Sequence, residues 1–231
     1  MSTNPIDIFI LAVLAISVLY GLYRGFINGI LSLAALLGSI WGAFATAPAL
    51  AQILAANETL VATLRYYTDA ASRIGSLDLS VMSVAETSKD AIVSILQNAK
   101  LPPAFEEAFL SHFESAAGGQ RVSSILSETI VGGVLQVMSF LICFAGIYLL
   151  SLLVVHFISY VFELPVLRHL DALVGGLFGF VRGVLLLIVL NLLLPIVLAA
   201  APIALLQTMI ADSTLLPLFN TSLIFSLLGL R

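Results

Sequence analysis

The chain has 231 residues, of which 61% are hydrophobic and only 10% are charged, and its formal net charge is −4. Water-soluble domains usually carry about 25% charged residues, so this composition argues strongly against a water-soluble globular enzyme. The acidic balance offers no basic surface, so we expect no nucleic-acid partner.

The charged residues are unevenly distributed along the chain. Residues 57–128 hold 14 of the 22, and five charge-free runs lie outside or at the edge of that region: 8–23, 25–57, 129–162, 183–211 and 213–230. A helix of about 20 residues crosses a bilayer core of roughly 30 Å. The pattern therefore predicts an all-α, polytopic transmembrane protein with about four spans.

Residues 1–56 are expected to form a transmembrane hairpin. Its first helix runs from about Ile6 to Tyr23, and residues 24–28 turn the chain or mark the interface. Residues 1–7 contain no Lys or Arg, unlike a cleaved signal peptide, so we interpret this helix as a retained span. The second helix starts near Phe26 and should end around Ala47–Pro48, because proline cannot continue a helical hydrogen-bond ladder.

Residues 57–128 differ in character from the spans. Gly75, Pro102–Pro103 and Gly118–Gly119 divide this region, and the segments between them carry apolar residues at helical spacing. The two apolar faces consist of Ile92, Ile95, Leu96 and Ala99, and of Phe105, Ala108, Phe109 and Phe113. We therefore expect amphipathic helices between spans two and three, outside the membrane or on its surface. Their apolar faces must bury against the bilayer surface, the transmembrane bundle or a partner protein.

Residues 129–202 are expected to form the second transmembrane pair. One span falls within 129–162, and the next covers 173–201, interrupted by Arg182. The C-terminal stretch, 203–231, could form a surface-lying helix, a re-entrant segment or a fifth span. We favour an apolar surface segment, because Pro217 and Asn220 break its apolar run. The whole chain is then one membrane domain.

The string Gly-x-x-Arg-Gly occurs twice, once in the first hairpin and once in the last span. Glycines spaced by four lie along one helix face and let a second backbone approach closely. The two sets are Gly21, Gly25 and Gly29 with Arg24, and Gly175, Gly179 and Gly183 with Arg182.

The arginines in these strings allow two interpretations. Each could be a structural anchor that reaches toward the lipid head groups. Alternatively, an arginine inside a span usually faces a partner or a water-filled cavity, because it costs at least a few kcal/mol at the bilayer centre. Asp7 and Asp171 are the candidate acidic partners near the spans.

Two blocks of the sequence, residues 5–45 and 167–195, resemble the colicin V production protein family of bacterial inner-membrane proteins. The resemblance is carried by Asp7 and the first glycine–arginine string, and by Asp171 and the second. It covers roughly a third of the chain. It implies a multi-pass protein of the bacterial inner membrane with about four spans, associated with toxin production or export and with the cell envelope.

No catalytic constellation is recognised, so we expect no enzymatic activity, no cofactor and no metal site. His112, His156 and His169 lack metal-ligand spacing, and the single cysteine, Cys143, cannot form an internal disulfide. Glu106–Glu107 point about 100° apart on a helix and fit a solvated face better than a catalytic pair.

Two functional hypotheses remain. The first is a non-enzymatic membrane protein that supports toxin production or export and envelope function. The alternative is a small transporter or channel subunit built around the two Gly-x-x-Arg-Gly strings. The expected partners are the lipid bilayer and either a second copy of the chain or other membrane proteins.

The two short basic segments predict the orientation in the membrane. Short loops rich in Lys and Arg stay in the cytoplasm, so the segments around Arg24 and Arg168 are expected there. The N-terminus, the central region and the C-terminus are then expected outside.

Overall fold

The computed structural model describes residues 4–68, 74, 81–99, 101, 103–161, 168–194 and 204–219. These residues form helices and no named strand, and three of the helices are long and apolar enough to cross a membrane: Pro5–Ala55, Val122–Phe157 and Ala172–Asn191. The prediction of an all-α fold is therefore confirmed, and three apolar helices fit a membrane protein, whereas about four spans were expected. The chain divides into two compact units, the first from 1–47, 140–193 and 203–221, and the second from 48–139, 194–202 and 222–231.

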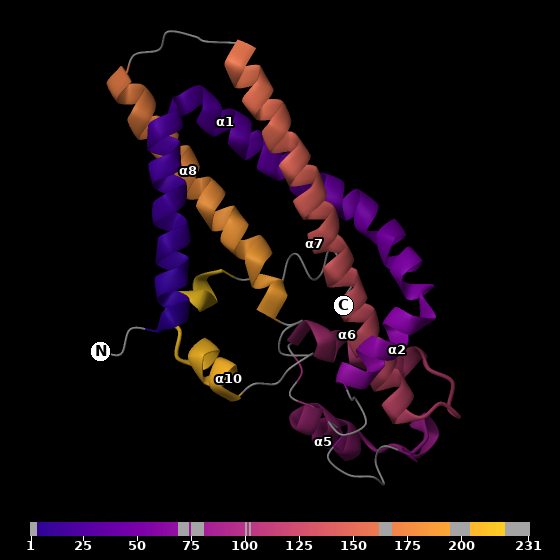
Figure 1. Ribbon diagram of the computed structural model, residues 1–231. Coiled ribbons are helices and arrows are strands. Elements are labelled where there is room, and N and C mark those ends of the chain that lie inside the picture. The colour runs from indigo at the N-terminus through magenta and orange to yellow at the C-terminus, as the bar shows by residue number, and fades with distance from the viewer. Residues whose placement is uncertain are drawn as a thin grey trace. The chain divides into compact units, whose positions relative to one another are not determined.

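Helix α1 (Pro5–Ala55) bends within the first unit (Figure 1). Gly25 interrupts its helical backbone with φ 78° and ψ −177°. This left-handed φ costs a side-chain-bearing residue energy but glycine very little. Gly25 thus separates a first arm, residues 5–24, from a second arm that begins at residue 26, and the expected turn at 24–28 is made with one non-helical residue.

The second arm does not end where the sequence suggested. The expected end at Ala47–Pro48 is wrong, because α1 continues as a helix to Ala55 with Pro48 inside it. Proline removes one backbone donor, yet the rest of the helical ladder can continue around it. Pro48 instead coincides with the boundary between the two compact units.

In the first unit, the second arm of α1 packs antiparallel against α7 (Val122–Val161). The Ser39 and Ser151 hydroxyl oxygens lie 3.4 Å apart, and the rings of Phe44 and Phe140 lie 4.8 Å apart. Small buried residues line this arm at helical spacing: Ser32, Ser39, Ala43 and Ala47. Small side chains let two apolar helices approach closely, which is how helices associate within lipid.

The first unit is completed by α8 (Arg168–Asn191), α10 (Ala204–Ala211) and the 3-10 helix η2 (Leu216–Leu218). Ile10, Leu187 and Phe219 form a buried apolar cluster where these segments meet. Asn191 also donates a hydrogen bond to the Phe219 carbonyl at 2.7 Å. The eight residues of α10 are far too few for a span, and the expectation for 220–231 lies outside the described residues.

The second unit contains α2 (Glu58–Thr68), η1 (Val84–Glu86), α5 (Lys89–Ala99), α6 (Pro103–Ser115) and the start of α7. Its core includes Ile74 and Ile95, which are both fully buried. The segment before η1 pairs with the start of α7, since the Val122 amide donates to the Met82 carbonyl at 3.1 Å. Helix α7 begins at Val122, seven residues before the charge-free run that we expected to define it.

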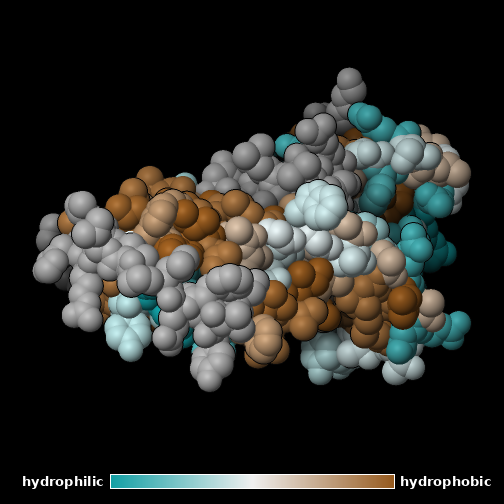
Figure 2. Space-filling view, turned by 90° about the horizontal axis from the view of Figure 1, so that it is seen from above, coloured by the Kyte–Doolittle hydropathy of each residue, from teal (hydrophilic) through white to brown (hydrophobic). Residues whose placement is uncertain are grey.

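The surface of the first unit carries large apolar side chains. Ile16, Leu153, Phe157 and Leu173 are all more than 60% exposed. Figure 2 shows broad hydrophobic patches open on the visible face. Contiguous apolar surface of this kind is rare on soluble proteins and is suited to contact with lipid tails.

Candidate functional site

The two glycine–arginine strings contact one another in the first unit. The first arm of α1 and α8 cross antiparallel, with Gly21 against Gly175 and Gly179 (Figure 1). A Cβ built on Gly175 would lie 2.5 Å from the Gly21 carbonyl oxygen and 2.7 Å from the Gly25 carbonyl carbon. Any side chain at Gly175 would therefore collide with backbone, so the close crossing requires glycine here.

The outer glycines of each set meet side chains. A Cβ on Gly29 would lie 3.1 Å from the Phe178 Cβ, and one on Gly183 would lie 3.0 Å from the Ser17 Cβ. Both distances are tighter than ordinary van der Waals contact. Glycines of both sets thus lie where the first arm of α1 and α8 cross.

Ser17 is a polar link at this crossing. Its hydroxyl donates to the Gly179 carbonyl at 2.7 Å, and the residue is 3% exposed. A Ser hydroxyl buried in lipid-facing structure needs such a partner, because an unpaired polar group there is costly. Ser17 continues the four-residue spacing of Gly21, Gly25 and Gly29, and that spacing could have identified it in the sequence.

Arg182 projects from α8 into the same crossing. The residue is 9% exposed, its Nε lies 3.4 Å from the Ser17 hydroxyl oxygen, and its guanidinium carbon lies 4.6 Å from the centre of the Tyr20 ring. A cation over an aromatic face is stabilised by roughly 0.5–2 kcal/mol. These neutral groups offset only part of the cost of burying a guanidinium.

Arg24 approaches the same tyrosine from the first arm. Its guanidinium carbon lies 5.5 Å from the Tyr20 ring centre, and its Nε is buried without a hydrogen-bond partner. Tyr148 of α7 lies within electrostatic range of both Arg182 and Tyr20. The two arginines of the repeated strings thus share one aromatic ring, at a place to which α1, α7 and α8 all contribute.

The depth of this place follows from helix geometry. Tyr20 lies five residues and Ser17 eight residues before the turn at Gly25, which is about 8–12 Å along the helix at about 1.5 Å per residue. A bilayer core is roughly 30 Å thick. Arg182 is therefore level with the interior of the first arm rather than with its end.

Of the two candidate acidic partners, only Asp7 has a described side chain, and it does not contact Arg182. Asp7 lies with the C-terminal segment, where its carboxylate accepts hydrogen bonds from the Ser213 hydroxyl at 2.6 Å and the Leu215 amide at 3.1 Å. Thr214 adds two more bonds, from its amide at 3.2 Å and its hydroxyl at 3.0 Å. The side chain of Asp171 lies outside the described residues. Tyr20, rather than Asp7, is the residue brought against Arg182.

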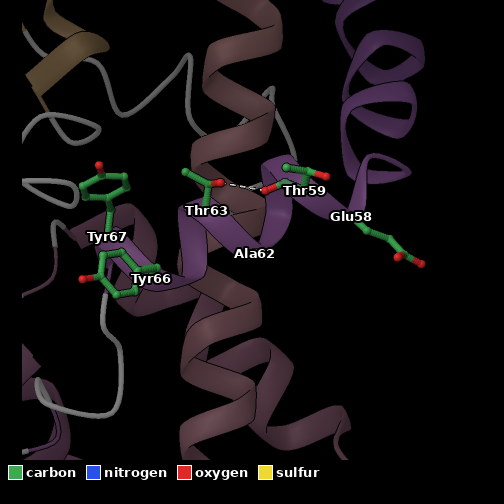
Figure 3. Close-up of a pocket in the computed structure, with 6 residues that line it drawn as sticks. All are labelled: Glu58, Thr59, Ala62, Thr63, Tyr66 and Tyr67. Atoms are coloured by element: carbon green, nitrogen blue, oxygen red, sulfur yellow. Dashed lines mark hydrogen bonds between the residues drawn. The ribbon is translucent and has the colours of Figure 1, made fainter.

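Away from this site, the exposed face of α2 forms a shallow groove in the second unit (Figure 3). It is lined by Glu58, Thr59, Ala62, Thr63, Tyr66 and Tyr67. The two tyrosine rings point outward and lie edge to face, 5.6 Å apart. The groove is open and lies along a single helix, so it provides no enclosed binding site.

Comparison with known proteins gives a family. The model of the colicin V production protein family matches residues 6–85 and 108–223. No curated protein and no solved structure matches the chain. The match covers far more of the chain than the two blocks recognised in the sequence. It includes the glycines at the crossing of α1 and α8 and both arginines beside Tyr20. Since most of its length fits this family model, the chain belongs to the colicin V production protein family.

Proposed function

We propose that this chain is a multi-pass protein of the bacterial inner membrane that supports toxin production or export, and envelope function, without catalysing a reaction. The family description supplies the link to toxin production. The structure has three candidate spanning helices, and the break in α1 at Gly25 supports counting its two arms as separate crossings, which with α7 and α8 would make four. With four crossings, the residues before α1 and those after α8 would lie on the same side of the membrane.

One observation carries the proposal for the site. The two Gly-x-x-Arg-Gly strings are separated by more than 150 residues, yet both bring their arginine to the Tyr20 ring. Two independent lipid anchors would have no reason to share a ring below the end of a span. We therefore assign the function to this glycine-packed helix pair and its two arginines.

The alternative, a small transporter or channel subunit, is favoured by the burial of Arg182. Charged residues inside membrane segments are rare and often mark the path of an ion or a substrate. Flux of anions, cations and amphiphiles into proteoliposomes tests this directly. Transport by the parent that is lost in Arg182→Gln would favour the alternative over the non-transport role.

Complementation of a null strain tests the main proposal. We expect Arg182→Gln to lose most of the parent's toxin release, because it removes the charge, and Arg182→Lys to retain only part, because it removes the planar fork. Arg65→Gln, at an exposed arginine of α2, is the matched control and should restore release fully. Toxin release is measured by halo assay, and membrane insertion by immunoblot.

If both Arg182 variants inserted normally and restored full release, Arg182 would be only an anchor. The assignment of function to the arginine pair would then be wrong.

A further inference from the structure

The strongest unexplained feature of the molecule is two positive charges beside one neutral ring. Arg182 is buried, and its contacts among the described residues are the Ser17 hydroxyl and the Tyr20 ring. A guanidinium has five N–H donors and no acceptor, and the hydrogen bond to Ser17 uses only the donor at Nε.

Arg24 adds a second positive charge beside the same ring. Its Nε is buried and has no hydrogen-bond partner, and its guanidinium faces the ring that Arg182 also faces. Two cations near each other in a medium of low dielectric constant repel strongly, and an aromatic quadrupole compensates only weakly. Tyr148, from α7, is not an acidic residue and supplies no carboxylate to balance them.

From this arrangement we propose that Arg24 and Arg182 together bind one oxyanion, beside Tyr20, within the first arm of α1. An oxyanion neutralises both guanidinium groups, and its oxygens accept the donors that the protein leaves unpaired. The planar fork of arginine matches phosphate and carboxylate oxygens. This inference rests on the proposed function, because it identifies the ligand class of the same helix pair.

The oxyanion has two available sources with the same chemistry. Tyr20 is 41% exposed and Tyr23, on the next turn, is 87% exposed, so the side of the arm that carries the ring is open to its surroundings. A phospholipid headgroup reaches it from the bilayer, and a small soluble anion reaches it from water near the turn at Gly25. Both would present oxygen atoms to the same donors.

The test uses the full-length protein purified in a non-ionic detergent. The probes are phosphatidylglycerol, phosphatidylcholine with the same acyl chains, and inorganic phosphate. Retained lipid is counted by native mass spectrometry, and phosphate binding is followed by the shift in thermal midpoint. Arg24→Gln, Arg182→Gln and the double variant are compared with the parent, and Arg65→Gln measures non-specific attraction to anions.

We expect the parent to retain phosphatidylglycerol over phosphatidylcholine, or to be stabilised by phosphate. Either single variant should lower that affinity about tenfold, the usual effect of losing a hydrogen bond to a charged group, with Arg65→Gln unchanged. Retention of phosphatidylglycerol alone identifies a lipid headgroup, and stabilisation by phosphate identifies a soluble anion. Both results support the oxyanion site.

Equal binding of all probes by the parent and the double variant would overturn the site. If Arg182→Gln alters elution from the sizing column, Arg24→Gln decides the matter, since its side chain is only half-buried. The binding measurement needs no toxin, so the binding site and the proposed role in toxin release can fail independently. Loss of binding with full complementation would reject the role in toxin release and keep the site.

Discussion

At the scale of single residues, the site depends on missing side chains. A Cβ on Gly179 would collide with the Ser17 carbonyl oxygen and lie 3.1 Å from the Gly21 Cα. Backbone atoms cannot rotate away as the end of a flexible side chain can. By contrast, a Cβ on Gly38, on the second arm of the same hairpin, would meet nothing within 4 Å.

This contrast gives a prediction with a built-in control. Gly179→Leu should lower the free energy of unfolding by at least about 1–3 kcal/mol, the usual cost of overpacking a core, while Gly38→Leu should change it little. The thermal midpoint of each variant in detergent, read by size-exclusion chromatography after heating, measures the difference. Equal midpoints for the two variants would contradict the close packing of α1 and α8.

At the scale of helices, α7 serves both compact units. Its 40 residues extend about 60 Å, about twice the thickness of a bilayer core. The portion that belongs to the second unit packs against α6, where a Cβ on Gly133 would lie 2.5 Å from the ring of Phe105. The aligned phenylalanines of α6 are thus covered by protein, with Phe105 and Phe109 fully buried.

A substitution in α6 tests this packing. Phe109→Ala should destabilise the second unit by about 3–5 kcal/mol, because it removes a buried ring and leaves a cavity. Leu110→Ala, at a neighbouring residue that is 39% exposed, is the control and should cost far less. Limited proteolysis of the full chain between residues 81 and 121 reports the effect. An unchanged cleavage rate in Phe109→Ala would show that the buried face contributes little.

At the scale of the whole molecule, the proposed four crossings and the two short basic segments predict the orientation. The turn at Gly25 should be cytoplasmic, and the segment between α1 and α7 should lie outside. Gly119→Cys places a thiol where a Cβ meets nothing within 4 Å, and Tyr23→Cys places one beside the turn at a residue that is 87% exposed. In a Cys143→Ser background, an impermeant maleimide should label position 119, but not position 23, in intact cells. The reverse pattern would invert the orientation.

The sequence predicts the apolar helices better than it predicts the start of α7 or the contact between Tyr20 and Arg182. Charge-free runs located the apolar helices, since lipid excludes charge, and the spacing of the glycines predicted the crossing face. The start of α7 was missed because Val122 to Thr129 contains Glu128, and a charge there does not stop a helix from continuing. Tyr20 could not be identified as the neighbour of Arg182, because this contact joins residues 162 positions apart and no local spacing encodes it.

The four hydrogen bonds on Asp7 join opposite ends of the chain, since Asp7 and Leu215 are separated by 208 residues. A ribosome adds about 5–20 residues per second, so about 10–40 s pass between the synthesis of Asp7 and that of its hydrogen-bond partners. During that interval the first arm of α1 must be held by other contacts or by the insertion machinery. The clasp between Asp7 and residues 213–215 is consequently among the last contacts to form during biogenesis, and a chain truncated before Ser213 would leave that carboxylate without its partners.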